Sequence, residues 1–379
     1  MRGLRSIVGT ATVFVTMVFA TVPALAVGAW RTVPSPNPTA NDQLGAVIAL
    51  SATDVWTTGT QYSTSDGSFH PLVVHYDGAS WQVVPVPEPA GVRSDELTSL
   101  SAVSATDIWA VGFSQVTKKV RHPLMEHYNG SAWSVVTLPP ALAGASLAAV
   151  AAVSSNDVWA VGAASGVPLV EHFDGSGWST VPSPGINGGH LDRVVAVSPT
   201  NLWAIGGQSG AGGSEFVEHF DGSSWSQVVL PAPTVPNAGW TLYGLSATSA
   251  GDVWAVGSVE SADGVSFRPL VEHYDGTAWL ILPAPNLNSS AQVSVFNAVT
   301  AISPTDVWAV GQGGPGNQQF FTLIEHYDGT TWQVVPSPSR TTVNGLDGIA
   351  HAGAGQLWAT GYSYPAGSTN GQTLVESYP

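Results

Sequence analysis

The sequence predicts an all-β protein: a seven-bladed β-propeller with four antiparallel strands per blade, whose N-terminal strand joins the C-terminal blade and closes the ring. Three observations support this fold. A β-prone unit recurs every 44 to 54 residues, which is the spacing typical of blades built from four short strands. Two tryptophans occupy fixed places in each unit, and the units at the two ends of the chain are incomplete in complementary ways.

The unit is clearest in residues 252–285. An apolar run at 253–257 ends in glycine and predicts one strand, and a second run at 270–274 predicts the next. Asp275-Gly276 then turns the chain back, and Trp279 opens a third run that leads to a proline-rich exit. Asp-Gly between two β-prone runs predicts a hairpin with a type I′ turn, because both central positions of that turn take positive φ.

A further β-prone run precedes these three, as at 97–104, so each unit has four strands, which we name a to d in chain order. Fourteen of the 15 tryptophans open strand d or lie in strand b. Because a buried tryptophan removes up to about 250 Å² from water, we expect them to pack neighbouring blades rather than to form a sugar-stacking ladder. The strand b residues are Trp56, Trp109, Trp159, Trp203, Trp254, Trp308 and Trp358, and the strand d residues are Trp30, Trp81, Trp133, Trp178, Trp225, Trp279 and Trp332.

The two ends of the chain complete one another. The last repeat stops at Tyr378-Pro379, where the other repeats have their Asp-Gly or Asn-Gly turn, so it has no strand d. Trp30 and the Val-Pro-Ser-Pro run that ends at Pro36 match a strand d that has no preceding strands. We therefore expect the ring to close by pairing the N-terminal strand with the last blade.

The N-terminus has the pattern of a secretory signal peptide. Arg2 and Arg5 precede an apolar stretch at 7–20, and Ala24-Leu25-Ala26 is a small-residue cleavage site. We expect residues 1–26 to be the signal peptide, residues 27–379 to be the propeller, and the protein to be secreted and extracellular. No later stretch is apolar over the roughly 18 residues that a membrane helix needs, so we expect no membrane insertion.

The charge balance argues against a polyanionic partner. The chain has ten lysines and arginines and 26 aspartates and glutamates, which gives a formal charge of −16 at pH 7. Nucleic-acid binding depends on a broad basic field, so we expect no nucleic acid among the partners. The chain has no cysteine and no zinc, calcium or phosphate-loop motif, and we expect no metal and no cofactor.

The repeat resembles the kelch and galactose-oxidase-like propellers over nearly all of residues 27–379. The shared features are a strand b that ends in glycine, a tyrosine or phenylalanine that closes strand c, and a tryptophan that opens strand d. The resemblance implies a propeller fold. Kelch blades typically carry a glycine pair after strand b, which this chain shows only at Gly206-Gly207. The copper site of galactose oxidase uses a cysteine-modified tyrosine, so the resemblance does not extend to that chemistry.

Two repeated sets of polar residues suggest a structural role. Glu-His recurs in strand c, and adjacent strand residues point to opposite faces, so the pair cannot easily converge on one ligand; a ring of repeated sugar sites is the alternative. An acid precedes most b strands, where we expect it to cap a turn through its own backbone. The Glu-His pairs are Glu126-His127, Glu171-His172, Glu218-His219, Glu272-His273 and Glu325-His326, and the acids are Asp54, Asp107, Asp157, Asp252 and Asp306.

Departures from the repeat indicate where a site would lie. The b-to-c and d-to-a loops vary in length between repeats, and binding residues concentrate on variable loops held by a rigid scaffold. We expect the site on this face of the disc, which we name the variable-loop face. The candidate ligand-binding residues are Trp240, Tyr243, His190, Asp192, Arg193, His351, Asn297, Lys118, Lys119, Arg121 and His122.

Three features distinguish these candidates. Trp240 is the one tryptophan outside the repeat positions, and either stacks on a sugar or packs on a neighbouring blade. His351 stands where six repeats have alanine in strand a, and so can face the central channel. Residues 118–122 form a basic cluster in a b-to-c loop, which either receives a carboxylate or sulfate or is simply solvated.

The function that follows is non-catalytic binding of carbohydrate or a cell-surface polymer through the variable-loop face. One alternative is a polysaccharide-degrading enzyme with its site at the channel mouth. A lyase would use His190, Arg193, His351 and Tyr243, whereas a hydrolase would use Asp192 and Asp347 as paired acids. A protein-interaction scaffold is the third reading.

Overall fold

The computed structural model describes residues 28–117, 120–139, 142, 144–208, 215–233, 239–262, 264–288, 292–316, 319–338 and 343–379. The predicted signal peptide, residues 1–26, lies outside the described residues. Throughout the described part the regular structure is β-strand, and none of it is a helix long and apolar enough to cross a membrane. The prediction of an all-β chain is confirmed.

The strands pair antiparallel in sets of four, and we call each set a blade. Blade 1 comprises β2 (Asp42–Ser51), β3 (Asp54–Ser63), β4 (Ser68–Tyr76) and β5 (Trp81–Val84); blade 2 comprises β6 (Ser94–Ser104), β7 (Asp107–Thr117), β8 (Val120–Tyr128) and β9 (Trp133–Val135). Blade 3 comprises β10 (Ala145–Ser154), β11 (Asp157–Ala164), β12 (Val167–Phe173) and β13 (Trp178–Thr180); blade 4 comprises β14 (Gly189–Ser198), β15 (Asn201–Gln208), β16 (Glu215–Phe220) and β17 (Trp225–Val228).

The later strands repeat the pattern. Blade 5 comprises β18 (Trp240–Ser249), β19 (Asp252–Glu260), β20 (Phe267–Tyr274) and β21 (Trp279–Leu282); blade 6 comprises β22 (Val293–Ser303), β23 (Asp306–Gly316), β24 (Gln319–Tyr327) and β25 (Trp332–Val334). Blade 7 comprises β26 (Val343–His351), β27 (Leu357–Tyr364) and β28 (Gln372–Tyr378), and its fourth strand is β1 (Arg31–Val33). Single parallel pairings, Phe267 with Val293 and Phe320 with Val343, link blades 5, 6 and 7.

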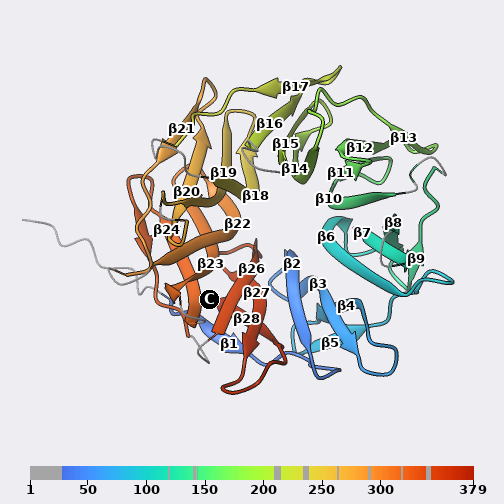
Figure 1. The fold of residues 1–379 in the computed structure, drawn as a ribbon, viewed down its shortest axis with the longest axis horizontal. Coiled ribbons are helices and arrows are strands. Elements are labelled where there is room, and N and C mark those ends of the chain that lie inside the picture. Colours follow the sequence, from blue (N-terminus) through green and yellow to red (C-terminus); the bar gives the residue numbers. More distant parts are fainter. Residues whose placement is uncertain are drawn as a thin grey trace, which may run out of the picture.

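The blades stand side by side around a common axis (Figure 1). The a strands β2, β6, β10, β14, β18, β22 and β26 line the centre, and the later strands of each blade lie progressively further out. This arrangement is a β-propeller, as the repeat predicts.

The repeated tryptophans form the core between blades. Trp56 of blade 1 meets Trp133 of blade 2 edge to face, with the ring centroids 6.1 Å apart. Trp81 of blade 1 meets Trp358 of blade 7 in the same way at 5.4 Å. Each of these rings is buried, so no face is free to stack on a sugar, and the expectation that they pack neighbouring blades is correct.

The acids before the b strands do not cap turns as expected. Asp54 Oδ1 accepts hydrogen bonds from Trp56 Nε1 at 2.9 Å and from His75 Nε2 at 2.8 Å, and that imidazole stacks on the Trp56 indole with centroids 4.0 Å apart. The equivalent aspartate–histidine bond, of 2.7 to 2.9 Å, recurs in blades 2, 3, 5 and 6. In blades 1, 3, 5 and 6 the same aspartate also accepts from the strand b indole, which completes a Trp-Asp-His triad. The histidines of these blades and of blade 2 therefore have the structural role that we expected.

The aspartate of the c-to-d turn, or Asn129 in blade 2, performs the capping instead. Asp77 Oδ1 accepts from the backbone N–H groups of Ala79 and Ser80, both at 2.9 Å. The Asp-Gly sites do form hairpins, but the loop has four residues and only its glycine takes a positive φ, 92° at Gly78. The prediction of a type I′ turn is therefore wrong, since that turn needs two residues with positive φ.

Candidate functional site

Every innermost strand carries a β-bulge near its start. The register of strand a against strand b shifts directly after an apolar residue, as between Leu191 and Arg193 in β14. A bulge leaves a residue unpaired and re-aims its side chain. The bulged positions are Gly45 and Ala46, then Thr98, Ala148, Asp192, Tyr243, Asn297 and Asp347. Four residues singled out as departures from the repeat therefore share one structural position around the channel.

A cavity of about 780 Å³ opens at the ends of these strands. Its walls come from the starts of the a strands in blades 1 to 4 and from the b strands of blades 1 to 3, with Arg121 added from strand c of blade 2 and Asp347 from blade 7. These strand ends lie beside the b-to-c and d-to-a loops, so the cavity is on the variable-loop face. Its size is within the roughly 300 to 1,000 Å³ range of ligand pockets.

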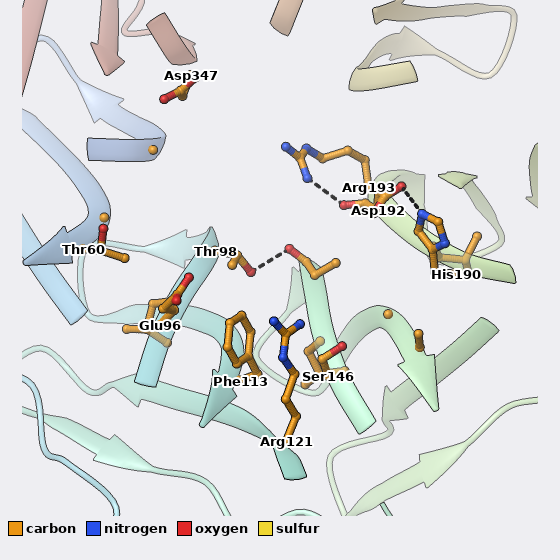
Figure 2. A pocket seen from close by; sticks show the side chains of 18 of the residues that line it. Thr60, Glu96, Thr98, Phe113, Arg121, Ser146, His190, Asp192, Arg193 and Asp347 are labelled. Carbon is orange, nitrogen blue, oxygen red and sulfur yellow. Dashed lines mark hydrogen bonds and ion pairs between the residues drawn. The ribbon is translucent and has the colours of Figure 1, made fainter. Parts of the chain in front are cut away.

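His190, Asp192 and Arg193 enter this cavity from β14 (Figure 2). His190 Nε2 lies 3.2 Å from Asp192 Oδ2, and this hydrogen bond raises the pKa of the imidazole. Arg193 Nη1 donates to the backbone carbonyl oxygen of Asp192 at 2.8 Å. The bulge at Asp192 thus presents three polar side chains from one short segment.

Asp347 lines the cavity from blade 7. Asn297 Nδ2 donates to Asp347 Oδ1 at 2.8 Å and to the carbonyl oxygen of Leu346 at 3.0 Å. Burial raises the pKa of Asp347 to about 6, although the Asn297 bond and the Arg193 charge act in the opposite direction. The two acids named for a hydrolase, Asp192 and Asp347, therefore line one cavity.

Arg121 and Glu96 contribute from blade 2. The Arg121 guanidinium lies over the Phe113 ring, with its carbon 4.0 Å from the ring centroid. Burial raises the pKa of Glu96, and the nearby Arg121 charge opposes that shift. Figure 2 shows the Arg121 and Arg193 guanidinium groups both directed into the open space.

The remaining candidates lie apart from the cavity. His351 ends β26 and pairs with Leu357 at the a-to-b turn, at the other end of the strand from the cavity. Trp240 is half-buried and packs against the core cluster of Trp203, Leu242 and Val259, so of the two expected roles it takes the packing one. The lyase set of His190, Arg193, His351 and Tyr243 is therefore not brought together.

Four further candidates either do not line the cavity or lie outside the described residues. Tyr243 is exposed at the bulge of β18 but does not line this cavity. His122 follows Arg121 in β8 and pairs with Ser114, so it points to the opposite face of that strand. Lys118 and Lys119 lie outside the described residues.

Sequence reasoning missed Glu96 and Glu215. Glu96 directly precedes Leu97, as His190 precedes Leu191, so aligning the repeats on this leucine would have found it. Glu215 opens β16 at a register position where proline occurs in blades 1, 2, 3 and 5. Burial raises its pKa to about 7 beside Asp192 and His190. Among the described residues no three histidine, aspartate or glutamate side chains are arranged to hold a metal.

Comparison with known proteins supports the fold. No family model matches the chain, and no curated protein matches it. The structure is similar to that of YCF48 bound to D1 peptide, with a TM-score of 0.60 and 16% identity over 94% of this chain and 98% of that one. It is similar to YCF48 from Cyanidioschyzon merolae, with a TM-score of 0.59 and 15% identity over 92% and 98% of the two chains.

A third similar structure is the GH74 xyloglucanase from Xanthomonas campestris. The TM-score is 0.57 and the identity 12%, over 91% of this chain and 55% of that one, so this chain spans about half the length of the xyloglucanase. At these identities the likeness shows a shared propeller fold. The resemblance to kelch and galactose-oxidase-like repeats stays a prediction from the residue pattern.

Proposed function

We propose that the protein is a secreted binding module that holds carbohydrate or a cell-surface polymer in the cavity on the variable-loop face, without chemistry. The cavity carries this proposal: it lies where the non-repeated residues gather, and charged side chains from blades 2, 4 and 7 line it. Leucines line the cavity beside these polar groups. A lining of both kinds suits a polyhydroxylated ligand, whose ring has apolar faces and polar edges.

The proposed scaffold is a closed, seven-bladed ring of the kelch-like type. Its support is the pairing of β1 with β28, from Arg31 with Ser377 to Val33 with Val375, and the contact of Trp358 in blade 7 with Trp81 in blade 1. A closed ring fixes the strand ends around the channel, so the cavity walls are preorganised and little entropy is lost on binding.

The test is retention on a panel of immobilised neutral, acidic and sulfated polysaccharides, with released fragments measured in the same samples. We expect retention without fragments, and we expect Asp192→Asn to abolish it. Asp328→Asn is the matched control, because it removes an equal charge from an exposed c-to-d turn on the opposite face, where blade 2 naturally has Asn129. Fragments would establish the lyase or hydrolase reading, to which Asp192 and Asp347 give a structural basis.

A peptide or protein partner is the second candidate. The YCF48 structure that resembles this chain over nearly its full length is bound to a peptide. If no polysaccharide is retained or cut, while peptides bind the natural protein and Asp192→Asn weakens that binding, a protein-interaction scaffold replaces carbohydrate binding as the proposed function.

A further inference from the structure

Two arginines give the cavity an unusual surplus of free donors. The described residues contain five arginines, and two of them, Arg121 and Arg193, line this one cavity in a protein of net charge −16. Within the described part of the chain the Arg121 guanidinium makes no hydrogen bond or ion pair and rests only on Phe113. Arg193 makes one hydrogen bond, to the Asp192 carbonyl oxygen. A guanidinium has five N–H donors, so most of this capacity is unused.

Two of the three carboxylates on the walls have a hydrogen-bond partner among the described residues. Asp192 faces His190, and Asp347 accepts from Asn297. Glu96 and Asp347 are shifted toward their neutral forms by burial, which raises both pKa values. Neither guanidinium has a carboxylate in hydrogen-bond contact, although the charges of Asp192 and Asp347 act on Arg193 and Glu96 lies near Arg121. A carboxylate is the planar anion that a guanidinium binds in bidentate fashion.

We infer that the ligand is a uronate-bearing polysaccharide, an inference that rests on the proposed function. Uronate carboxylates along the polymer pair with Arg121 on one wall and with Arg193 on another, and the sugar hydroxyls donate to the oxygens of Asp192, Asp347 and Thr98. One acidic sugar unit supplies an anion and several hydroxyl donors together. An acidic peptide supplies the anion but few hydroxyls, and so leaves the wall oxygens without donors.

The experiment compares polygalacturonate with its fully methyl-esterified form and with neutral dextran, by calorimetry on the purified protein. The ester keeps the hydroxyls and removes the charge. We expect polygalacturonate to bind at least tenfold more tightly than the ester, because hydrogen bonds to charged groups are the stronger ones. Arg121→Gln is expected to weaken polygalacturonate binding about tenfold and so to narrow the difference between polygalacturonate and its ester, in line with the loss of one charge-assisted contact.

Arg93→Gln is the matched control. Arg93 is exposed just before β6 and lies outside the cavity, so its loss changes the net charge equally. If Arg93→Gln weakens polygalacturonate binding as much as Arg121→Gln does, the attraction is a general field effect and the inference fails. Arg193→Gln is the second variant, and its unfolding midpoint is measured alongside, since this side chain is half-buried.

The failures of the two proposals are distinguishable. Equal binding of polygalacturonate, its ester and dextran would overturn the uronate inference while keeping carbohydrate binding. Absence of binding to all three, with binding of poly-glutamate, would overturn both in favour of an acidic peptide. Polygalacturonate binding is also expected to strengthen from pH 8 to pH 5.5, as Asp347 takes up a proton and His190 becomes charged. A uronate stays ionised there because its carboxyl titrates near 3.5, like an α-carboxyl.

Discussion

At the scale of the residue, the Trp-Asp-His triad explains why a charged pair is repeated in a protein with so few charges. One carboxylate oxygen satisfies an indole N–H and an imidazole N–H, and the imidazole covers the indole face. Buried polar atoms cost about 1 to 3 kcal/mol each when they lack a partner. The repeated histidine is thus a packing residue whose Nε2 atom has a hydrogen-bond partner.

Blade 4 breaks this rule and supplies a test. Asn201 replaces the aspartate, and the buried atoms Asn201 Oδ1, Trp203 Nε1 and His219 Nε2 have no hydrogen-bond partner among the described residues. Asn201→Asp is expected to restore the triad and stabilise the fold by about 1 kcal/mol, the usual net value of a hydrogen bond. Denaturant unfolding measures the gain.

The pH dependence of this variant has a defined sign. Burial now lowers the pKa of His219 below 6.5, so protonation opposes folding and stability falls as the pH falls past that value. An aspartate partner favours the charged imidazole and raises the folded pKa from this lowered value, which removes the penalty on protonation at low pH. The gain is therefore larger at pH 5.5 than at pH 8. An unchanged His219 titration by NMR would contradict the restored bond.

At the scale of the element, the glycine that we expected to end each strand b lies inside that strand and is required by the bulge beside it. A Cβ on Gly257 would lie 1.8 Å from the Thr241 carbonyl oxygen and 2.8 Å from the Leu242 Cα. These atoms belong to backbone and cannot rotate away. The same close approach occurs beside every bulge, for example 1.9 Å between a Cβ on Gly112 and the Glu96 carbonyl oxygen.

Gly257→Ala is therefore expected to destabilise the protein by more than about 2 kcal/mol, as overpacking of a tight site does. Gly177→Ala is the control, because a Cβ there meets nothing within 4 Å. Thermal and denaturant unfolding of both variants give the comparison. Equal stability of the two would mean that strands a and b separate at little cost, and that the bulge is not held by this contact.

The same element marks the boundary of what the sequence could predict. Periodicity located the strands, the turns and the variable-loop face, because these depend on residues near one another in the chain. The cavity depends on bulges in several a strands. A bulge shifts the pairing register of a strand, and the residue spacing within one repeat does not show where that shift occurs. Asp192 and Arg193 were found because they break the repeat. Glu96 was missed because its partner in the cavity, Arg121, lies 25 residues away on another strand.

At the scale of the whole molecule, the proposed ring is held by joining the two ends of the chain. Trp30 is buried against Trp308 and Tyr378, with ring centroids 6.1 and 5.6 Å away. A Cβ on Gly28 would lie 2.8 Å from the Pro379 ring, so the start of β1 and the end of β28 are adjacent. In every other blade a short turn connects these two strands.

This adjacency predicts that a circular permutant will fold. Joining Pro379 to Gly28 through a two-residue Asp-Gly linker and opening the chain before Asn41 would make blade 7 continuous, with its strands in the order a, b, c and d. The permutant would then no longer need the N-terminal strand β1 to pair with the C-terminal strand β28, because the linker connects these two strands covalently. We expect the permutant to keep polysaccharide binding, because the cavity walls come from strands that stay in place.

Deleting residues 28–36 instead removes β1 and exposes the edge of β28. Since Trp30 alone is a large buried side chain, whose loss costs roughly 3 to 5 kcal/mol, we expect this truncation to unfold at lower denaturant concentration and to aggregate through the free edge. Size-exclusion chromatography and denaturant unfolding compare the three proteins. A truncated chain as stable and monomeric as the natural one would mean that β1 does not close the ring, and the remaining blades would then have to hold the channel mouth open by packing alone.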